Sequence, residues 1–174
     1  MDSHRKGVRC APTVEDDRAA IEKLLRRTGL FREGEVLVAM EVLDVYLYRE
    51  GQEDYRVFSA FVGQRVGGYV CFGPNTMTEG TFELYWIAVD PPFQGQGLGT
   101  ALMETAEGEA ARRGARMLVA ETSSRPDYTP ALTFYRRRGY LVTARVPDYY
   151  APGDDKLILV KHFTETCTPA DPGS

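Results

Sequence analysis

Residues suited to metal and redox chemistry are scarce in this chain of 174 residues, which has two histidines and three cysteines. His4 and His162 lie near opposite ends of the sequence, and Cys10, Cys71 and Cys167 show neither metal-ligand nor redox spacing. We therefore expect no metal site. The odd number of cysteines favours a reducing compartment over a disulfide-bonded secreted protein.

Long apolar runs are also missing. No segment has the length of a membrane span or the pattern of a secretory signal peptide. The net charge of −4 argues against nucleic acid or an anionic membrane as the main partner. From these absences we expect a soluble, cytoplasmic protein.

The composition that remains is that of a folded domain, with 43 % hydrophobic and 26 % charged residues. We find no internal repeat and no linker long enough to divide the chain. We therefore expect a single domain over residues 1–174, with an ordered core from about 8 to 163 and flexible tails.

The hydrophobic pattern predicts an α/β fold, a mixed but mostly antiparallel central sheet of about seven strands with flanking helices. Helices are predicted from an N-cap at Thr13 to Arg27, over 33–48, over 98–113, and from an N-cap at Thr129 with Pro130 first, up to Gly139. Strands are predicted at 8–11, 55–62, 65–72, 81–89, 117–120, 141–146 and 156–161. Short turns predict an antiparallel meander over 55–89, whereas the helix at 98–113 predicts that its flanking strands run parallel.

A glycine-rich turn, Gln94–Thr100 (QGQGLGT), connects the strand at 81–89 to the following helix. Glycine lets the backbone approach a ligand, and the first turn of a helix offers free N–H groups and a positive dipole end. This combination favours a phosphate group. A helix-opening turn without any ligand is the alternative.

Two common phosphate-binding motifs fit this turn poorly. A P-loop requires a lysine, and none follows Gly97 or Gly99. A dinucleotide-binding fold requires a third glycine where Thr100 stands, and the preceding meander is unusual for that fold. Glu121 nevertheless stands about 20 residues on, where that fold has its ribose-binding acid.

A third motif fits better. Gln94-Gly95-Gln96-Gly97-Leu98-Gly99 resembles Gln/Arg-x-x-Gly-x-Gly/Ala, the pyrophosphate motif of the GCN5-related N-acetyltransferase (GNAT) superfamily. Ala131–Tyr140 (ALTFYRRRGY) is similar to the second signature of that superfamily, Ala-x-x-Leu/Phe-Tyr-x-x-x-Gly-Phe/Tyr. The order of predicted elements agrees from about Val8 to Phe163.

The resemblance implies that acetyl-CoA is the acyl donor and lies along the strand that ends at Val89. Main-chain groups of Ile87, Ala88 and Val89 are implied to pair with the pantetheine arm and to place an N–H at the thioester carbonyl. The pyrophosphate is implied to bind to the amides of the turn, namely those of Gln94, Gly95, Gln96, Gly97, Leu98, Gly99 and Thr100.

The resemblance also implies catalytic residues. Tyr135 stands where the superfamily often has the general acid that protonates the departing thiolate, although a helix tyrosine is otherwise a common core residue. Glu121 stands where acetyltransferases of ribosomal-protein alanine carry the general base. Glu83 is the rival base, because strand alternation places it on the same face as Tyr85 and Ile87.

The acceptor side is less defined by the sequence. The segment Asp148–Lys156 carries two tyrosines and three acids, which predicts either a lid over a cationic amine or a plain hairpin loop. We expect Tyr85, Tyr149 and Tyr150 to contact the acceptor. Tyr128 stands where the superfamily commonly has an asparagine that touches the cofactor.

The predicted activity is direct transfer of an acetyl group from acetyl-CoA to a primary amine, by general acid and base catalysis through a tetrahedral intermediate and without a metal. The acceptor is either a small-molecule amine or a protein or peptide amine, including the ribosomal-protein alanine type. A non-catalytic acyl-CoA-binding module is the alternative from another class. A homodimer is a family-level expectation.

Overall fold

The computed structural model describes residues 7–163. The predicted flexible tails, with His4 and Cys167, lie outside the described residues. The strands are β1 (Val8–Pro12), β2 (Arg56–Val62), β3 (Arg65–Pro74), β4 (Thr81–Val89), β5 (Met117–Ser123), β6 (Leu141–Ala151) and β7 (Asp154–His162). The helices are α1 (Arg18–Thr28), α2 (Glu33–Tyr48), α3 (Leu98–Arg112) and α4 (Thr129–Arg137), with short 3-10 turns η1 (Glu15–Asp17), η2 (Pro91–Phe93) and η3 (Pro126–Tyr128).

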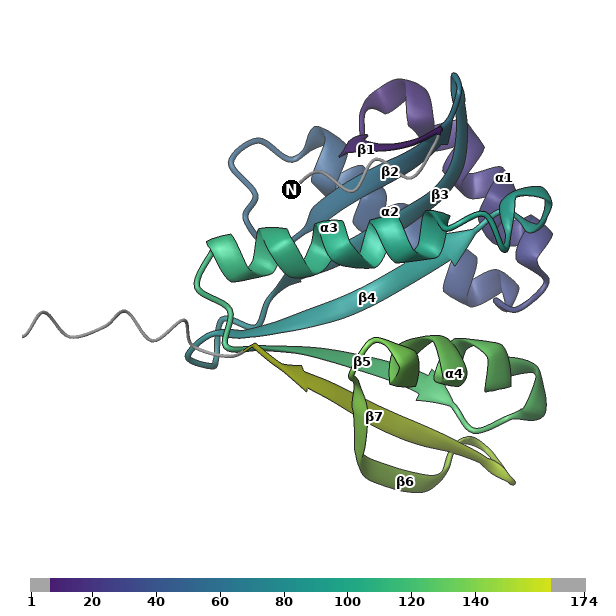
Figure 1. Cartoon of the computed structure of the whole chain (residues 1–174), viewed down its shortest axis with the longest axis vertical. Coiled ribbons are helices and arrows are strands. Elements are labelled where there is room, and N and C mark those ends of the chain that lie inside the picture. Colours follow the sequence, from purple (N-terminus) through teal and green to yellow (C-terminus); the bar gives the residue numbers. More distant parts are fainter. Residues whose placement is uncertain (1–6, 164–174) are drawn as a thin grey trace, which may run out of the picture.

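The strands form one mixed sheet of seven strands in the order β1-β2-β3-β4-β5-β7-β6 (Figure 1). This confirms the predicted α/β class. The meander β2-β3-β4 is antiparallel, as predicted from its short turns. Within the described residues β4 and β5 are the one parallel pair, and α3 is the crossover between them.

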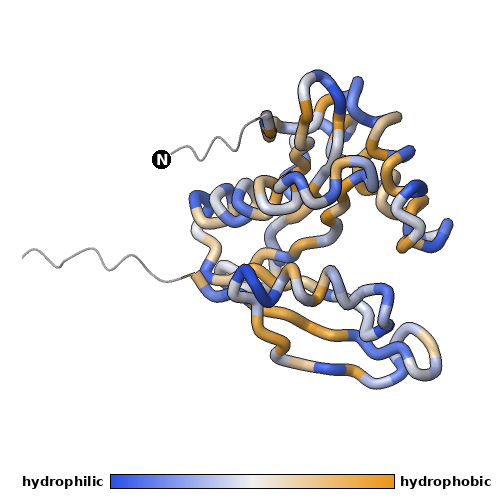
Figure 2. Tube along the Cα trace, turned by 45° about the vertical axis from the view of Figure 1, so that its right-hand side comes forward, coloured by the Kyte–Doolittle hydropathy of each residue, from blue (hydrophilic) through white to orange (hydrophobic). Residues whose placement is uncertain are grey.

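Helices cover both faces of the sheet and bury two hydrophobic clusters. On one face α3 buries Leu98, Leu102 and Met103 against the sheet, in a cluster that also contains Tyr135 of α4. On the other face α1 and α2 bury a second cluster that includes Ile21 and Leu43. Figure 2 shows where hydrophobic and hydrophilic residues lie along the helices and strands.

The sheet divides between β4 and β5. The two strands pair only from Thr81 opposite Met117 to Leu84 opposite Ala120. Beyond that register they diverge, and Figure 1 shows the ends of β4 and β5 pointing apart. One reason lies on the other edge of β4, where Cys71 faces Trp86 and Phe72 faces Leu84, so that Tyr85 forms a β-bulge. The last four residues of β4, Trp86–Val89, are therefore paired with β3 alone.

Three local predictions were wrong. Thr13 is not an N-cap, because its hydroxyl hydrogen-bonds to Ser59 Oγ (2.8 Å) and a 3-10 turn precedes α1. Thr129 is the first residue of α4, because η3 runs directly into that helix. The loop predicted over 147–155 is mostly strand, with a two-residue turn between β6 and β7.

The pairing of β6 with β7 is interrupted between Val146 and Ala151, and a buried carboxylate supports the irregular backbone there. Asp148 has φ +53°, and its N–H donates to Asp155 Oδ1 at 2.9 Å. The guanidinium of Arg145 pairs with the same carboxylate. The sequence pattern showed the acids but not that one of them holds the strand together. Among residues 7–163 no helix has both the length and the apolar character that crossing a bilayer demands.

Candidate functional site

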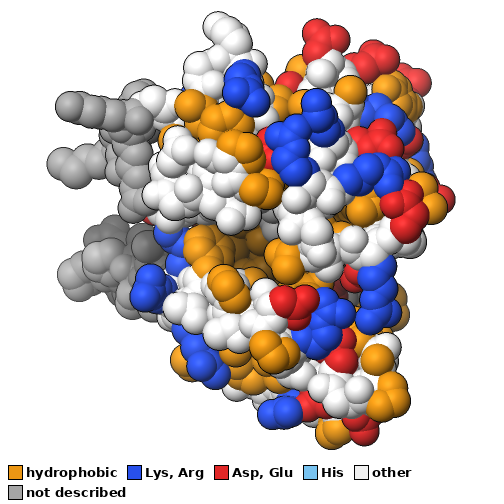
Figure 3. All heavy atoms as spheres, turned by 90° about the vertical axis from the view of Figure 1, so that its right-hand side faces the viewer, with side chains coloured by type: hydrophobic (Ala, Val, Ile, Leu, Met, Phe, Trp, Pro, Cys, Tyr) orange, Lys and Arg blue, Asp and Glu red, His pale blue; other side chains and the backbone are white. Residues whose placement is uncertain are grey.

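The gap between β4 and β5 is a cleft of about 1240 Å³. It is lined by β4 from Glu83 to Val89, by the glycine-rich turn, by the end of β5, by α4 and by the connection between α1 and α2. Figure 3 looks into this hollow, whose floor carries apolar side chains. The cleft contains most of the residues that the sequence singled out.

The glycine-rich turn presents main-chain groups to one end of the cleft. Gly95 and Gly97 have φ +76° and +89°, which a side chain would oppose. Gly97 is the N-cap of α3 and no side chain caps that helix, so its first-turn N–H groups have no capping acceptor. The side-chain amides of Gln94 and Gln96 donate to the carbonyls of Val89 (3.2 Å) and Pro92 (3.0 Å) and support the turn.

The main chain of β4 presents a second set of polar groups. Ala88 is opposite Tyr69 of β3, and the N–H of Asp90 donates to the carbonyl of Gly67 at 2.9 Å. Successive N–H groups of a strand point to opposite sides, so the N–H of Ala88, two residues before Asp90, also points toward β3. Those of Ile87 and Val89 point into the cleft. Of the three predicted positions, Ala88 thus contributes a side chain buried on the α1–α2 face rather than a free N–H.

An ion pair that the sequence analysis missed fixes the start of the turn. Asp90 is 5 % exposed, and its carboxylate accepts from Arg27 Nη1 of α1 at 2.8 Å. The contact joins residues 63 positions apart and ties the end of α1 to the end of β4. Sequence reasoning assigned Arg27 only to a helix end, so no local signal identified this partner.

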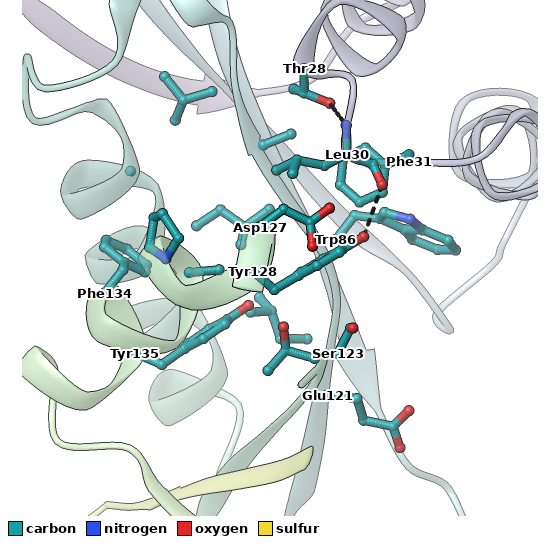
Figure 4. Close-up of a pocket in the computed structure, with 18 of the residues that line it drawn as sticks. Thr28, Leu30, Phe31, Trp86, Glu121, Ser123, Asp127, Tyr128, Phe134 and Tyr135 are labelled. Atoms are coloured by element: carbon teal, nitrogen blue, oxygen red, sulfur yellow. Dashed lines mark hydrogen bonds between the residues drawn. The ribbon is translucent and has the colours of Figure 1, made fainter. Parts of the chain in front are cut away.

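Tyr135 projects from α4 to the floor of the cleft. It is 6 % exposed, and its ring packs edge-to-face on the rings of Phe134 and Tyr140, with ring centres 5.8 and 5.5 Å apart. In Figure 4 its hydroxyl points into the cavity. Burial raises the pKa of Tyr135 above the ordinary phenol value, so the hydroxyl keeps its proton at neutral pH. A protonated phenol in this place can act as an acid.

The two candidate bases have different surroundings. Glu121 of β5 has a side chain that is 48 % exposed and pairs with Lys156 Nζ at 2.6 Å. Its carboxylate points away from Tyr135 in Figure 4. Glu83 of β4 accepts a hydrogen bond from Asn75 Nδ2 at 2.9 Å. Both residues line the cleft.

The three tyrosines expected at the acceptor side are not equivalent. Tyr85 lines the cleft, its ring packs edge-to-face on Tyr55, and burial together with Glu83 raises its pKa. Tyr150 also lines the cleft, near the end of β6. Tyr149 is 55 % exposed and is not among the lining residues. Its ring lies 4.5 Å from Lys156 Nζ instead.

The sequence analysis also missed a buried polar pair, Ser123 and Asp154, both of which line the cleft. Ser123 (8 % exposed) donates from its hydroxyl to the carboxylate of Asp154 (4 % exposed). From the sequence, Asp154 is predicted only to be one of the acids of a lid or a plain hairpin loop. Only the pairing of β5 with β7, which puts Ser123 opposite Lys156, brings the two side chains together.

Comparison with known proteins agrees with this architecture. The model of the acetyltransferase (GNAT) family matches residues 19–140, a range that includes β4, the glycine-rich turn and α4. The chain belongs to this family. The motif resemblance over Gln94–Gly99 and Ala131–Tyr140 therefore reflects membership of the GNAT family.

Relatives and solved structures support the same assignment. An uncharacterized N-acetyltransferase of Methanocaldococcus jannaschii is 30 % identical over 105 residues, which cover 60 % of this chain and 64 % of that protein, less than two thirds of its length. A structure from Desulfovibrio desulfuricans assigned to GNAT acetyltransferases is 36 % identical with a TM-score of 0.85, covering 89 % of this chain and 98 % of that one.

A more distant structure shares the fold. The ribosomal-protein-S18-alanine N-acetyltransferase from Escherichia coli has a TM-score of 0.75 at 20 % identity, covering 94 % of this chain and 99 % of that one. At this level of identity the likeness concerns the arrangement of helices and strands. The acceptor named for the Escherichia coli enzyme belongs to that protein.

Proposed function

We propose that this GNAT chain transfers an acetyl group from acetyl-CoA directly to a primary amine. The observation that carries the proposal is the convergence of three features in one cleft. These are the free main-chain edge at Ile87 and Val89, the uncapped start of α3 at Gly97, and the buried hydroxyl of Tyr135.

The residues present fit acetyl-CoA. The first-turn N–H groups of α3 suit a pyrophosphate, and the extended edge of β4 suits the amides of a pantetheine arm. Gly99 supports this fit, since an added Cβ would lie 3.5 Å from the ring of Phe134 and 3.7 Å from Val89. A side chain at Gly99 would occupy space between α3 and Phe134 of α4 that the glycine leaves free at the cleft. Acetyl-CoA supplies the acetyl thioester.

In the proposed reaction the chain orients the reactants and moves two protons. The N–H of Val89 or Ile87 stabilises negative charge that develops on the carbonyl oxygen. Glu121, or Glu83, accepts a proton from the amine, directly or through water. Tyr135 donates its hydroxyl proton to the departing sulfur, which its raised pKa permits because the phenol is protonated throughout the neutral range.

Direct transfer is favoured over a covalent cysteine route. Cys71 is 2 % exposed and burial raises the pKa of its thiol, which suppresses the reactive thiolate. Burial also raises the pKa of Cys10, which lies on β1. Neither of these two described cysteines lines the cleft.

The acceptor is proposed to be a small-molecule amine, with a protein N-terminus as the second candidate. The second candidate is kept because the chain shares its fold with the ribosomal-protein-S18-alanine enzyme and has Glu121 and Tyr150 at the cleft. Carboxylates of Glu83, Glu121 and Asp154 suit a cationic amine of either kind.

Acetyl-CoA binding followed by an acceptor screen tests the proposal. Acetyl-CoA is expected to raise the melting temperature, and coenzyme A thiol is expected to be released only when an amine is added. The screen compares small primary amines with peptides bearing a free N-terminal alanine. Acetyl-CoA binding without transfer to any amine would instead indicate a non-catalytic binding module, and absence of binding would refute the proposal altogether.

A further inference from the structure

One side chain crosses the cleft from the β5 side to the β4 side. The hydroxyl of Tyr128 donates to the main-chain carbonyl of Leu30 at 3.0 Å, and the two residues are 98 positions apart (Figure 4). Tyr128 ends η3, which follows β5. Leu30 follows α1, whose end is tied to β4 through the ion pair between Arg27 and Asp90. The hydrogen bond therefore bridges the β4 side and the β5 side of the cleft.

The Tyr128 end of this bridge is held in place. Arg125 lies 5.3 Å from the centre of the Tyr128 ring, and its guanidinium bonds to Asp127 at 2.7 and 3.1 Å. The N–H of Arg125 donates to Ser123 Oγ at 3.1 Å, and Ser123 is bonded to the buried Asp154 of β7. The 3-10 turn is thus anchored to the sheet before it reaches Tyr128.

The Leu30 end is held by the end of α1. Gly29 adopts φ +67° and closes the helix, and its N–H donates to the carbonyl of Arg26. Thr28 Oγ1 donates to the carbonyl of Leu25 at 2.8 Å and accepts from the N–H of Leu30 at 3.4 Å. The carbonyl of Leu30 is consequently presented at a fixed position for the Tyr128 hydroxyl.

The bridge lies beside the α1–α2 face of the sheet, against which Phe31 and Trp86 pack, whereas Leu98 of the glycine-rich turn is buried in the cluster on the other face. Phe31 comes from the same α1–α2 connection as Leu30, and Trp86 comes from β4; both line the cleft close to the bridge (Figure 4). Tyr128 is half-buried there, and burial raises the pKa of its phenol, so the hydroxyl remains a donor at neutral pH. In Figure 4 the Tyr128 ring lies between the Leu30–Phe31 segment and Tyr135, and all four residues line the cleft.

We propose that Tyr128 determines acceptor specificity: its bridge to Leu30 narrows the acceptor opening and favours a primary amine on an unbranched carbon over an amine on a branched one. The inference rests on the proposed acetyl transfer. It makes an ω-amino chain a better acceptor than the α-amine of a peptide, because the α-carbon carries a side chain and a carbonyl that must fit beside the Tyr128 ring.

The test measures kcat/KM for two isomeric probes, 1-aminobutane and 2-aminobutane, with wild type, Tyr128→Phe and Tyr128→Ala. Tyr128→Ala removes the ring and is expected to raise the ratio of branched to unbranched kcat/KM by about 10-fold or more, the scale of steric discrimination in an apolar pocket. Tyr128→Phe keeps the ring but loses the hydrogen bond, so a rise of about 2- to 10-fold is expected. Tyr48→Phe, on the exposed side of α2, is the control and leaves the ratio unchanged.

A second measurement separates this inference from the proposed function. Amide hydrogen exchange at residues 29–33 is expected to be faster in Tyr128→Phe than in wild type, because the bridge no longer holds the connection. If wild type acetylates no small amine and no peptide of the acceptor screen, the proposed function fails. If it acetylates amines but the ratio is the same in Tyr128→Ala as in wild type, the specificity role of Tyr128 is refuted while the function stands.

Discussion

The β4 side and the β5 side of the cleft contribute different kinds of chemical groups. The β4 side offers mainly backbone, with N–H groups at Ile87 and Val89 and an uncapped helix start after Gly97. The β5 side offers mainly side chains, namely the carboxylate of Glu121 and, from the helix that follows, the hydroxyl of Tyr135. Backbone groups suit the invariant part of the reaction, the donor, whereas side chains can be varied to suit different acceptors.

The largest expected effect is on the β5 side. Tyr135→Phe removes the proposed proton donor and leaves the ring packed against Phe134 and Tyr140. Turnover is expected to fall about 10- to 1000-fold, while acetyl-CoA affinity changes little, since general acid catalysis contributes about 10²–10⁴. Steady-state thiol release and calorimetry check the two halves of this prediction.

The matched control for this variant is Tyr48→Phe, a tyrosine on α2 that is 55 % exposed. It is expected to leave turnover and affinity at wild-type values. If Tyr135→Phe also turns over at the wild-type rate, Tyr135 is not the acid and its hydroxyl only lines the cleft.

The next largest effect distinguishes Glu121 of β5 from Glu83 of β4 as the general base. Glu121→Gln is expected to lower kcat/KM about 10- to 100-fold near pH 7, and the loss should shrink as the amine deprotonates without help at higher pH. Glu83→Gln keeps an oxygen that accepts from Asn75 and is expected to lose less. Glu41→Gln, on the exposed face of α2, is the control. A larger loss in Glu83→Gln would assign the base to β4 instead.

A smaller effect is expected on the β4 side. Gly97→Ala places a side chain at φ +89°, which costs about 1–2 kcal/mol in the left-handed region. The turn should relax away from its ligand-binding shape, and the affinity for acetyl-CoA should fall about 10-fold with turnover at saturation largely kept.

Gly108→Ala on the same helix provides the comparison for Gly97→Ala. An added Cβ there would meet only the flexible Arg112 Nη1 at 3.6 Å, so affinity should be unchanged. Equal affinities for Gly97→Ala and Gly108→Ala, measured by calorimetry, would show that the turn does not hold the donor.

The last prediction concerns the pH dependence of turnover, in which we expect no decline. Burial raises the pKa of Tyr135, so loss of its proton is displaced to a pH above the ordinary phenol value of about 10. Turnover at saturating substrates is therefore expected not to decline between pH 8 and 10. A decline there that is missing in Tyr135→Phe would show that the phenol titrates in this range.

The backbone side of the site was largely predictable from sequence, because its signals are local. The bounds of β4 and α2 agree with the predicted 81–89 and 33–48, and the glycines of the turn adopt the positive φ values that glycine permits. The parallel pairing of β4 with β5 follows from the helix between them.

The side-chain part was less predictable, because it depends on contacts between distant segments. Neither the bridge from Tyr128 to Leu30 nor the ion pair of Arg27 with Asp90 has a local signal. The bulge at Tyr85 changes which face each later residue of β4 occupies, which simple alternation does not anticipate. The sequence pattern predicts a loop near Asp148, because the carboxylate of Asp155 that supports this strand lies across the turn.

Amide hydrogen exchange of the wild-type chain with and without acetyl-CoA reports whether the backbone of β4 and of the glycine-rich turn binds the donor. If β4 and the glycine-rich turn bind the donor through their backbone, acetyl-CoA alone will slow exchange at residues 86–89 and 94–100. Unchanged exchange over both of these segments, at a concentration of acetyl-CoA that saturates binding, would contradict the account.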